Sequence, residues 1–326
     1  MSGYDRSARF QPMTPPPFAR ILVGYIPTEQ GADARAVGVD LAAACGTDLL
    51  LVSIVAAVWL EHVGEQTGPA VVHTGERDRA ASALKDAAGE FASVPGIGHV
   101  GRRLEASSSP SRGLHDTAVS EQADLVVVGS SHRGPLGRVL LGSVGERLLS
   151  GAPCAVAVVP RGYAAHGPHT FAVIAVAFDG SPEARVALDA AHDLATRTGA
   201  ALRAVMVVEL PAALPGQFVP LPGLEPLITI ERADALRRQE QAATNVLDAA
   251  VCALGSGVAV EQQVLFGNDP AASILDVAGA DVDLLVLGSR AYGPVRRALV
   301  GSVSSTVVRH SPCPVLVTPR LSDGAD

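Results

Sequence analysis

The chain has 326 residues, of which 48% are hydrophobic and 18% are charged, so it has enough apolar side chains for more than one buried core. Its formal net charge of −8 argues against a general nucleic-acid-binding surface. No segment has the roughly 20 apolar residues of a membrane span, and the polar N-terminal stretch lacks the apolar region of a signal peptide. The four cysteines show no CxxC spacing, and the two that precede apolar strands, Cys154 and Cys313, are interpreted as buried core residues. This cysteine usage fits a reducing compartment, so a cytoplasmic location is expected.

Apolar strands alternate with helical segments along the chain. In the first half, strands are predicted near residues 20–24, 48–55, 99–105, 124–129 and 154–159. In the second half, they are predicted at 171–178, 201–209, 258–266, 283–288 and 314–319. Helices are predicted there from a cap at Asp179 or Ser181 to Gly199, over roughly 231–254, from Asp269–Pro270 to about Ala278, and from Ser302. This alternation predicts mostly parallel sheets, whose ligands sit at the carboxyl ends of the strands.

One segment occurs twice, at residues 125–160 and 284–319. The matching residues are 159 apart: Gly129 and Gly288, Gly142 and Gly301, Cys154 and Cys313, and Pro160 and Pro319. Nearer the start of each half the offset is 153 residues, as between Val23 and Val176. The repeat predicts two copies of one domain, at 19–162 and 171–320, joined by a linker at 163–170. Residues 1–18 are expected to be a disordered tail, and 321–326 a second tail.

The loop after the fourth strand of each copy has the form G-x12-G-S. The first loop contains His132, Arg133 and Arg138, the second contains Arg290, Arg296 and Arg297, and neither contains an acid. Glycines let backbone N–H groups approach an anion, and the following helix N-terminus adds its dipole, so the loops predict a phosphate site. The alternative is that the glycines shape a turn and that Ser143 and Ser302 cap helices, Ser143 forming a capping box with Glu146. The two interpretations are compatible.

Together with the A/S-P-C-x-V strand that follows, this motif resembles the universal stress protein family in its tandem two-domain form, over residues 19–320. The resemblance implies an α/β fold of two doubly wound five-stranded parallel-sheet domains, each with strand order 3-2-1-4-5. It also implies binding of ATP, with or without Mg²⁺, the base lying near the ends of strands one and two and the phosphates in the glycine loop. The implied binding residues of the second domain are Asp179, Val207, Leu287, Gly288, Arg290, Gly301, Ser302 and Val303. Those of the first domain are Ile54, Val128, Gly129, Gly142, Ser143 and Val144.

Both copies depart from the family pattern G-x2-G-x9-G-[S/T]. The second glycine is His132 in the first copy and Ala291 in the second. The acid that the family uses near the nucleotide is present as Asp179 in the second copy and replaced by Ile26 in the first. We therefore expect the second domain to bind nucleotide more tightly than the first.

The resemblance implies an adenine-nucleotide-binding stress-response protein that acts as a sensor or regulator through an unknown protein partner, without a nucleic-acid or membrane partner. The domains are expected to form an intramolecular pseudo-dimer through their fifth strands, and a homodimer of whole chains stays open. One alternative is an interaction module that binds no nucleotide. Another is a slow ATPase, although Lys85 is the sole lysine, no P-loop or G-x-S-x-G motif exists, and no acid/base pair recurs, so we expect no enzyme.

Overall fold

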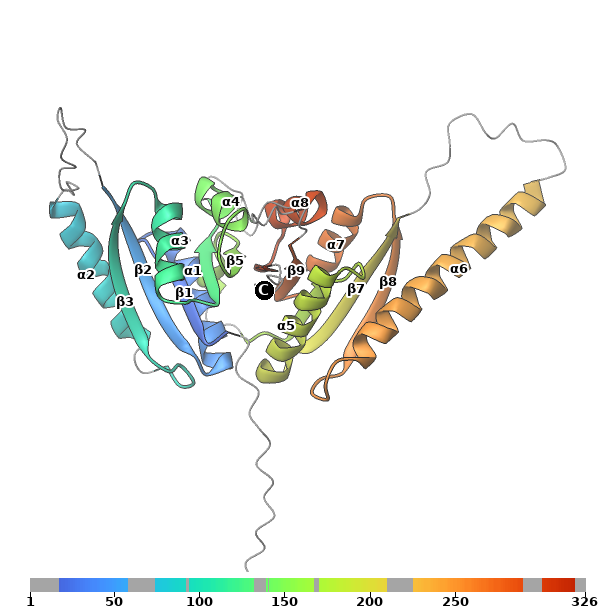
Figure 1. Ribbon diagram of the computed structural model, residues 1–326, viewed down its shortest axis with the longest axis horizontal. Coiled ribbons are helices and arrows are strands. Elements are labelled where there is room, and N and C mark those ends of the chain that lie inside the picture. Colours follow the sequence, from blue (N-terminus) through green and yellow to red (C-terminus); the bar gives the residue numbers. More distant parts are fainter. Residues whose placement is uncertain are drawn as a thin grey trace, which may run out of the picture.

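In the computed structural model, the described residues form one sheet of ten strands, with helices on both faces (Figure 1). It describes residues 18–57, 74–91, 94–131, 139, 141–166, 170–209, 225–289 and 301–319. Apart from Phe18, the predicted tails lie outside these residues. Along the sheet the strands follow the order β3-β2-β1-β4-β5-β10-β9-β6-β7-β8. Each half therefore has the predicted order 3-2-1-4-5, and the halves do not interleave.

The elements of the first half lie close to the predicted ones. Its strands are β1 (Arg20–Gly24), β2 (Asp48–Ala56), β3 (Val100–Ser107), β4 (Leu125–Gly129) and β5 (Ala155–Val159). Its helices are α1 (Glu29–Cys45), α2 (Thr74–Phe91), α3 (Pro110–Ser120) and α4 (Ser143–Leu149). A short 3₁₀ helix, η1 (Tyr163–His166), follows in the predicted linker, and Asp33 of α1 accepts hydrogen bonds from the backbone N–H groups of Gly162 and Ala164. This part of the linker is thereby attached to the first half.

The second half repeats the pattern. Its strands are β6 (Val173–Ala177), β7 (Ala201–Glu209), β8 (Val260–Gly267), β9 (Leu284–Gly288) and β10 (Val315–Thr318). Its helices are α5 (Pro182–Thr198), α6 (Glu225–Cys252), α7 (Pro270–Ala278) and α8 (Ser302–His310). Of these elements, α6 differs most from its prediction, because it begins about two turns earlier than expected. None of the helices within the described residues is both long and apolar enough to cross a membrane.

Local sequence explains the ends of α5. Ser181 is the N-cap, and its side chain accepts a hydrogen bond from the N–H of Ala184. Pro182 follows at the first helical position, where its missing N–H costs no hydrogen bond. Gly199 closes the helix with φ at 74°, a left-handed conformation that glycine adopts easily. Of the two predicted caps, Ser181 is therefore the one that forms, and Asp179 lies two residues before it.

The sheet is covered on both faces by helices that pack apolar side chains against it. Ile21 and Val23 belong to a cluster with α1, α2, α5 and α6, whereas Leu22 belongs to a second cluster with α3, α4, α7 and α8. This alternation follows from the period of two along a strand. Because both faces are buried, the central strands are continuously apolar, as expected for a doubly wound sheet.

The halves join through their fifth strands, as predicted. β5 and β10 pair antiparallel, with Ala157 opposite Leu316, Val158 opposite Val315, and Val156 opposite Val317. Ala157 and Leu316 are equivalent residues of the repeat, so a pseudo-twofold axis passes through this pair. The interface is isologous, like that of a symmetric dimer, although both sides belong to one chain. As a result, the carboxyl ends of the two sets of parallel strands lie at opposite edges of the sheet.

Candidate functional site

The first glycine of each loop lies at the end of the fourth strand and is required by packing. A Cβ placed at Gly288 would lie 2.6 Å from the carbonyl carbon and oxygen of Glu183, in the first turn of α5. A Cβ at Gly129 would clash in the same way with the carbonyl oxygen of Gln30, in the first turn of α1. Glycine here lets the strand end approach the helix closely. This requirement holds whether or not a ligand binds.

The last glycine of each loop begins the helix that follows, and here the predicted capping is wrong. Gly142 and Gly301 are the N-caps of α4 and α8, and neither helix has a side-chain hydrogen bond at its cap. Ser143 and Ser302 are the first helical residues and are exposed, so the predicted capping box of Ser143 and Glu146 does not form. We call Gly142–Ser143 the first corner and Gly301–Ser302 the second corner. Within the residues that the structure describes, no side chain caps their first-turn N–H groups.

Nothing in the described protein demands glycine at the first corner. Gly142 has φ at −85°, which any residue adopts, and the nearest atom to a Cβ placed there is the Cβ of Ser131 at 3.6 Å, an ordinary contact. Gly301 has a similarly permitted φ of −58°. Helix N-caps usually carry Ser, Thr, Asp or Asn, whose side chains satisfy the first N–H groups. Glycine leaves these donors open instead, which suits a ligand that supplies its own acceptors.

A hydrogen bond ties the second corner to the strand end. Ser304, in the first turn of α8, lies with its hydroxyl 3.3 Å from the carbonyl oxygen of Gly288 and donates to it. Gly288 is therefore held between the first turns of α5 and α8. In the first half, the residue equivalent to Ser304 is Gly145, and the carbonyl of Gly129 accepts from Nε2 of Gln30 at 2.9 Å instead. The two strand ends are thus held by different hydrogen bonds, and Ser304 joins a corner helix to its strand end in the second half.

The loop after the first strand carries the clearest difference between the halves. Asp179 is exposed just beyond β6, and its carboxylate accepts the N–H of Ser181 at 3.0 Å. Gly180 between them has φ at 82°, a left-handed conformation. At the equivalent place in the first half, Ile26 is 40% exposed. Because one half has an exposed carboxylate here and the other an exposed isoleucine, the strand ends of the two halves differ in polarity.

The four residues that are predicted to contact the base differ in how deeply they are buried. Val128 and Leu287 are buried in the cluster under α3, α4, α7 and α8, so they contribute to core packing. Ile54 and Val207 are partly buried against the same cluster. Val144 and Val303, which follow the two corners, are also partly buried there. The partly buried residues are therefore the ones with apolar surface left for a ligand.

Two buried serines were missed by the sequence analysis. Ser130 and Ser289 directly follow Gly129 and Gly288, and each is 2% exposed. Within the described residues, neither hydroxyl has a hydrogen-bond partner. Buried polar groups are normally hydrogen-bonded, so each of these hydroxyls points to a water, a ligand or an undescribed part of the loop. Their spacing of 159 residues was the sequence signal that could have identified them.

The basic residues of the loops lie outside the described residues; they are His132, Arg133, Arg138, Arg290, Arg296 and Arg297. Ala291 also lies outside the described residues. Among the residues that are described, no group of three or more His, Cys, Asp or Glu could hold a metal ion. The described part of each candidate site thus consists of a strand end, an uncapped helix start and a first-strand loop.

Comparison with known proteins gives a consistent result. Residues 17–160 and 170–319 each match the universal stress protein family. A universal stress protein of Mycobacterium tuberculosis is 28% identical over 299 residues, which cover 92% of this chain and 99% of that protein. One from Thermus aquaticus is 35% identical over 150 residues, covering 45% of this chain and 98% of that protein. In fold, the crystal structure of a universal stress protein from Archaeoglobus fulgidus is similar, with a TM-score of 0.64 at 20% identity, covering 95% of this chain and 98% of that one.

Proposed function

This chain belongs to the universal stress protein family, and we propose that it binds an adenine nucleotide, ATP, chiefly in its second half. We propose further that a protein partner in a stress response recognises the nucleotide-bound form, and that the protein regulates rather than catalyses. The observation that carries the proposal is the second corner. There an uncapped nine-residue helix begins beside a strand end fixed between two helices, with an exposed aspartate at the neighbouring strand end.

The described residues fit such a ligand. The N–H groups that follow Gly301 would donate to phosphate oxygens, helped by the positive end of the α8 dipole. Ser302 would add its exposed hydroxyl, and the buried Ser289 hydroxyl offers a further polar group. Arg290, outside the described residues, would supply positive charge. Mg²⁺ would enter with the phosphates, whose oxygens are its preferred ligands.

The rest of the nucleotide would lie along the carboxyl ends of β6 and β7. By family resemblance, Asp179 would accept hydrogen bonds from the ribose hydroxyls. Val207, Leu287 and Val303 would provide the apolar surface for the base, most of it from the partly buried Val207 and Val303. The negative charge of bound ATP would let a protein partner distinguish the nucleotide-bound form from the free form.

In the first half the same positions would form a weaker site. Gly129, Gly142 and Ser143 would receive phosphates, and Ile54, Val128 and Val144 would face the base. Ile26 cannot accept a hydrogen bond from a ribose hydroxyl. This exposed isoleucine also favours a second candidate function, in which the first half contacts a protein partner without binding nucleotide.

The proposal is tested on the full chain. Mass spectrometry of small molecules released from the purified protein should detect an adenine nucleotide. ATP should also slow hydrogen exchange of the backbone amides in 288–303, and Ser302→Ala combined with Arg290→Ala should weaken ATP binding by a few kcal/mol in calorimetry, because each removes a contact to a charged group. Thr306→Ala removes a hydroxyl from an exposed position of the same helix and serves as the matched control.

Three results would redirect the assignment. Unchanged affinity in the double variant would place the ligand elsewhere. Absence of ATP binding in the wild type would leave the interaction module as the function. Steady release of ADP and phosphate from ATP, lost in the double variant, would show an ATPase.

A further inference from the structure

Helix α8 extends from one candidate site to the other. It begins at the second corner and ends at His310, and Ser311 follows. The carbonyl of Ser311 accepts a hydrogen bond of 2.9 Å from the N–H of Val139, which belongs to the first half and lies three residues before Gly142. Val139 is 1% exposed, so this contact across the halves is buried. The C-terminal end of α8 therefore contacts the chain that leads into the first corner.

A second contact holds the same corner from its other side. Nη2 of Arg309, in the last turn of α8, lies 2.8 Å from Oε1 of Glu146, in the first turn of α4. The N–H of Glu146 donates to the carbonyl of Gly142, so Glu146 closes the first turn of α4. Val139 and Glu146 thus lie on either side of Gly142 in sequence, and both are bonded to the second half.

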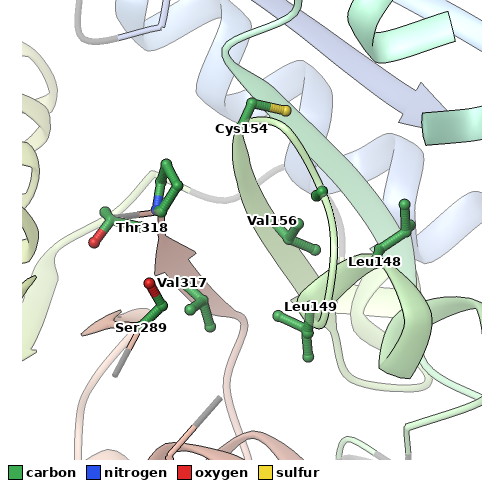
Figure 2. Close-up of a pocket in the computed structure, with 9 residues that line it drawn as sticks. Leu148, Leu149, Cys154, Val156, Ser289, Val317 and Thr318 are labelled. Atoms are coloured by element: carbon green, nitrogen blue, oxygen red, sulfur yellow. The ribbon is translucent and has the colours of Figure 1, made fainter. Parts of the chain in front are cut away.

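Helix α4 makes the reciprocal approach. It begins at the first corner, and its last residues, Leu148 and Leu149, line a small cavity between the halves (Figure 2). The other wall of this cavity includes Ser289, Val317 and Thr318, at the carboxyl ends of β9 and β10. Helix α4 therefore begins at its own corner and ends against strand ends of the second half, whereas α8 ends against the segment before the first corner.

The ion pair has no counterpart in the second half. The residues equivalent to Glu146 and Arg309 are Ser305 and Ser150, which carry no charge. The side chains of Arg309 and Glu146 are 45% and 44% exposed, so the ion pair contributes to stability as a partly solvated surface pair does. The pseudo-symmetric scaffold thus holds the first corner with a charge contact that the second corner lacks.

We propose that Arg309, supplied by the second half, is a positioning residue for the first corner, and that α8 links the two corners. The inference rests on the proposed function, because it concerns the regulation of the same sites. A nine-residue helix is about 13 Å long and moves as one piece. A nucleotide that draws the N-terminus of α8 toward its phosphates also shifts Arg309 and Ser311, and through them Val139 and Glu146.

Hydrogen exchange of the full chain tests this, read from peptides covering 141–149 and 301–310 with and without ATP. Arg309→Gln should speed exchange at the start of α4 by about two- to fivefold, the range for an exposed ion pair. It should also reduce by a similar factor any effect of ATP on 141–149, while the ATP midpoint for 301–304 shifts by no more than about that factor, because coupling between two sites acts equally in both directions. Arg309→Lys, which keeps the charge, should restore part of the effect. Arg237→Gln breaks the exposed helical pair of Arg237 and Asp234 and is the matched control.

A double-mutant cycle with Glu146→Gln identifies the contact. If Arg309 acts through Glu146, adding Arg309→Gln to Glu146→Gln changes nothing further at 141–149. Wild-type exchange at 141–149 in Arg309→Gln would overturn the proposal, as would an equal change in Arg237→Gln. If ATP alters neither peptide in the wild type, the proposed function fails. Exchange rates of the ligand-free protein would then still show whether Arg309 positions the first corner.

Discussion

At the scale of single residues, the two glycines of each motif serve different purposes. Gly288 is fixed by the close approach of α5, whereas no close contact or left-handed backbone demands glycine at Gly142. The sequence could predict that both positions matter, because both recur in the repeat. It could not assign their roles, since the first turn of α5 is far from Gly288 in the chain and meets it only in the folded sheet.

Substitution of Gly288 by alanine should destabilise the protein. The new Cβ would lie 2.6 Å from backbone atoms of Glu183, and overpacking of this kind costs about 1–3 kcal/mol. Gly89→Ala is the control, because a Cβ at this position in α2 meets nothing within 4 Å. That change should stabilise the protein by about 0.5–1 kcal/mol through helix propensity. Urea denaturation measures both, and a neutral Gly288→Ala would contradict the packing assigned to this glycine.

Burial of the cysteines predicts a loss of stability at high pH. Burial raises the pKa of Cys154 to about 12 and the pKa of Cys313 to about 11, from 9.0. A raised thiol pKa means that folding favours the protonated form, so its contribution is complete below pH 9 and disappears as pH rises toward 11–12. The free energy of unfolding should fall above pH 9 by at most about 1.4 kcal/mol per pH unit and thiol. In Cys154→Ala this slope should be shallower, and an unchanged slope would show that this thiol is not responsible.

At the scale of elements, the sequence predicted the strands well and the helix starts less well. The apolar runs located the strands of the described residues to within about two residues, and most clearly for the inner strands, which are buried on both faces. The caps were harder to predict. Ser143 and Ser302 look like N-caps, yet Gly142 and Gly301 take that position and the serines enter the helix. The sequence around a serine at the N-cap resembles the sequence around a serine in the first turn. Only the backbone conformation distinguishes the two positions.

This difference at the helix starts has a measurable consequence for stability. Ser181→Ala removes a side chain that caps α5 and should lower the free energy of unfolding by about 1 kcal/mol. Ser302→Ala removes no cap bond and should change it by less than about 0.5 kcal/mol. Thermal or urea unfolding of the two variants provides the comparison. Equal losses would mean that Ser302 caps α8 in solution.

At the scale of the whole molecule, the repeat made the architecture predictable and hid the differences between its copies. A constant offset predicts equivalent domains, and the fifth-strand seam places Ala157 opposite its equivalent Leu316. Contacts made in one copy alone could not be predicted this way. The ion pair of Glu146 with Arg309 and the bond between Ser304 and Gly288 involve residues that differ between the halves, so pseudo-symmetry gives no information about them.

The central claim is that the second half is the stronger nucleotide site, and ATP titration of the full chain by native mass spectrometry tests it most directly. A hydrogen bond to a charged acceptor contributes roughly 1.5–3 kcal/mol, or about ten- to hundredfold in affinity. Asp179→Ala should therefore weaken binding of the first ATP by about that factor, while Ile26→Ala, at the equivalent position, should leave it unchanged. An affinity that is insensitive to Asp179→Ala, or one that falls with Ile26→Ala, would contradict the account.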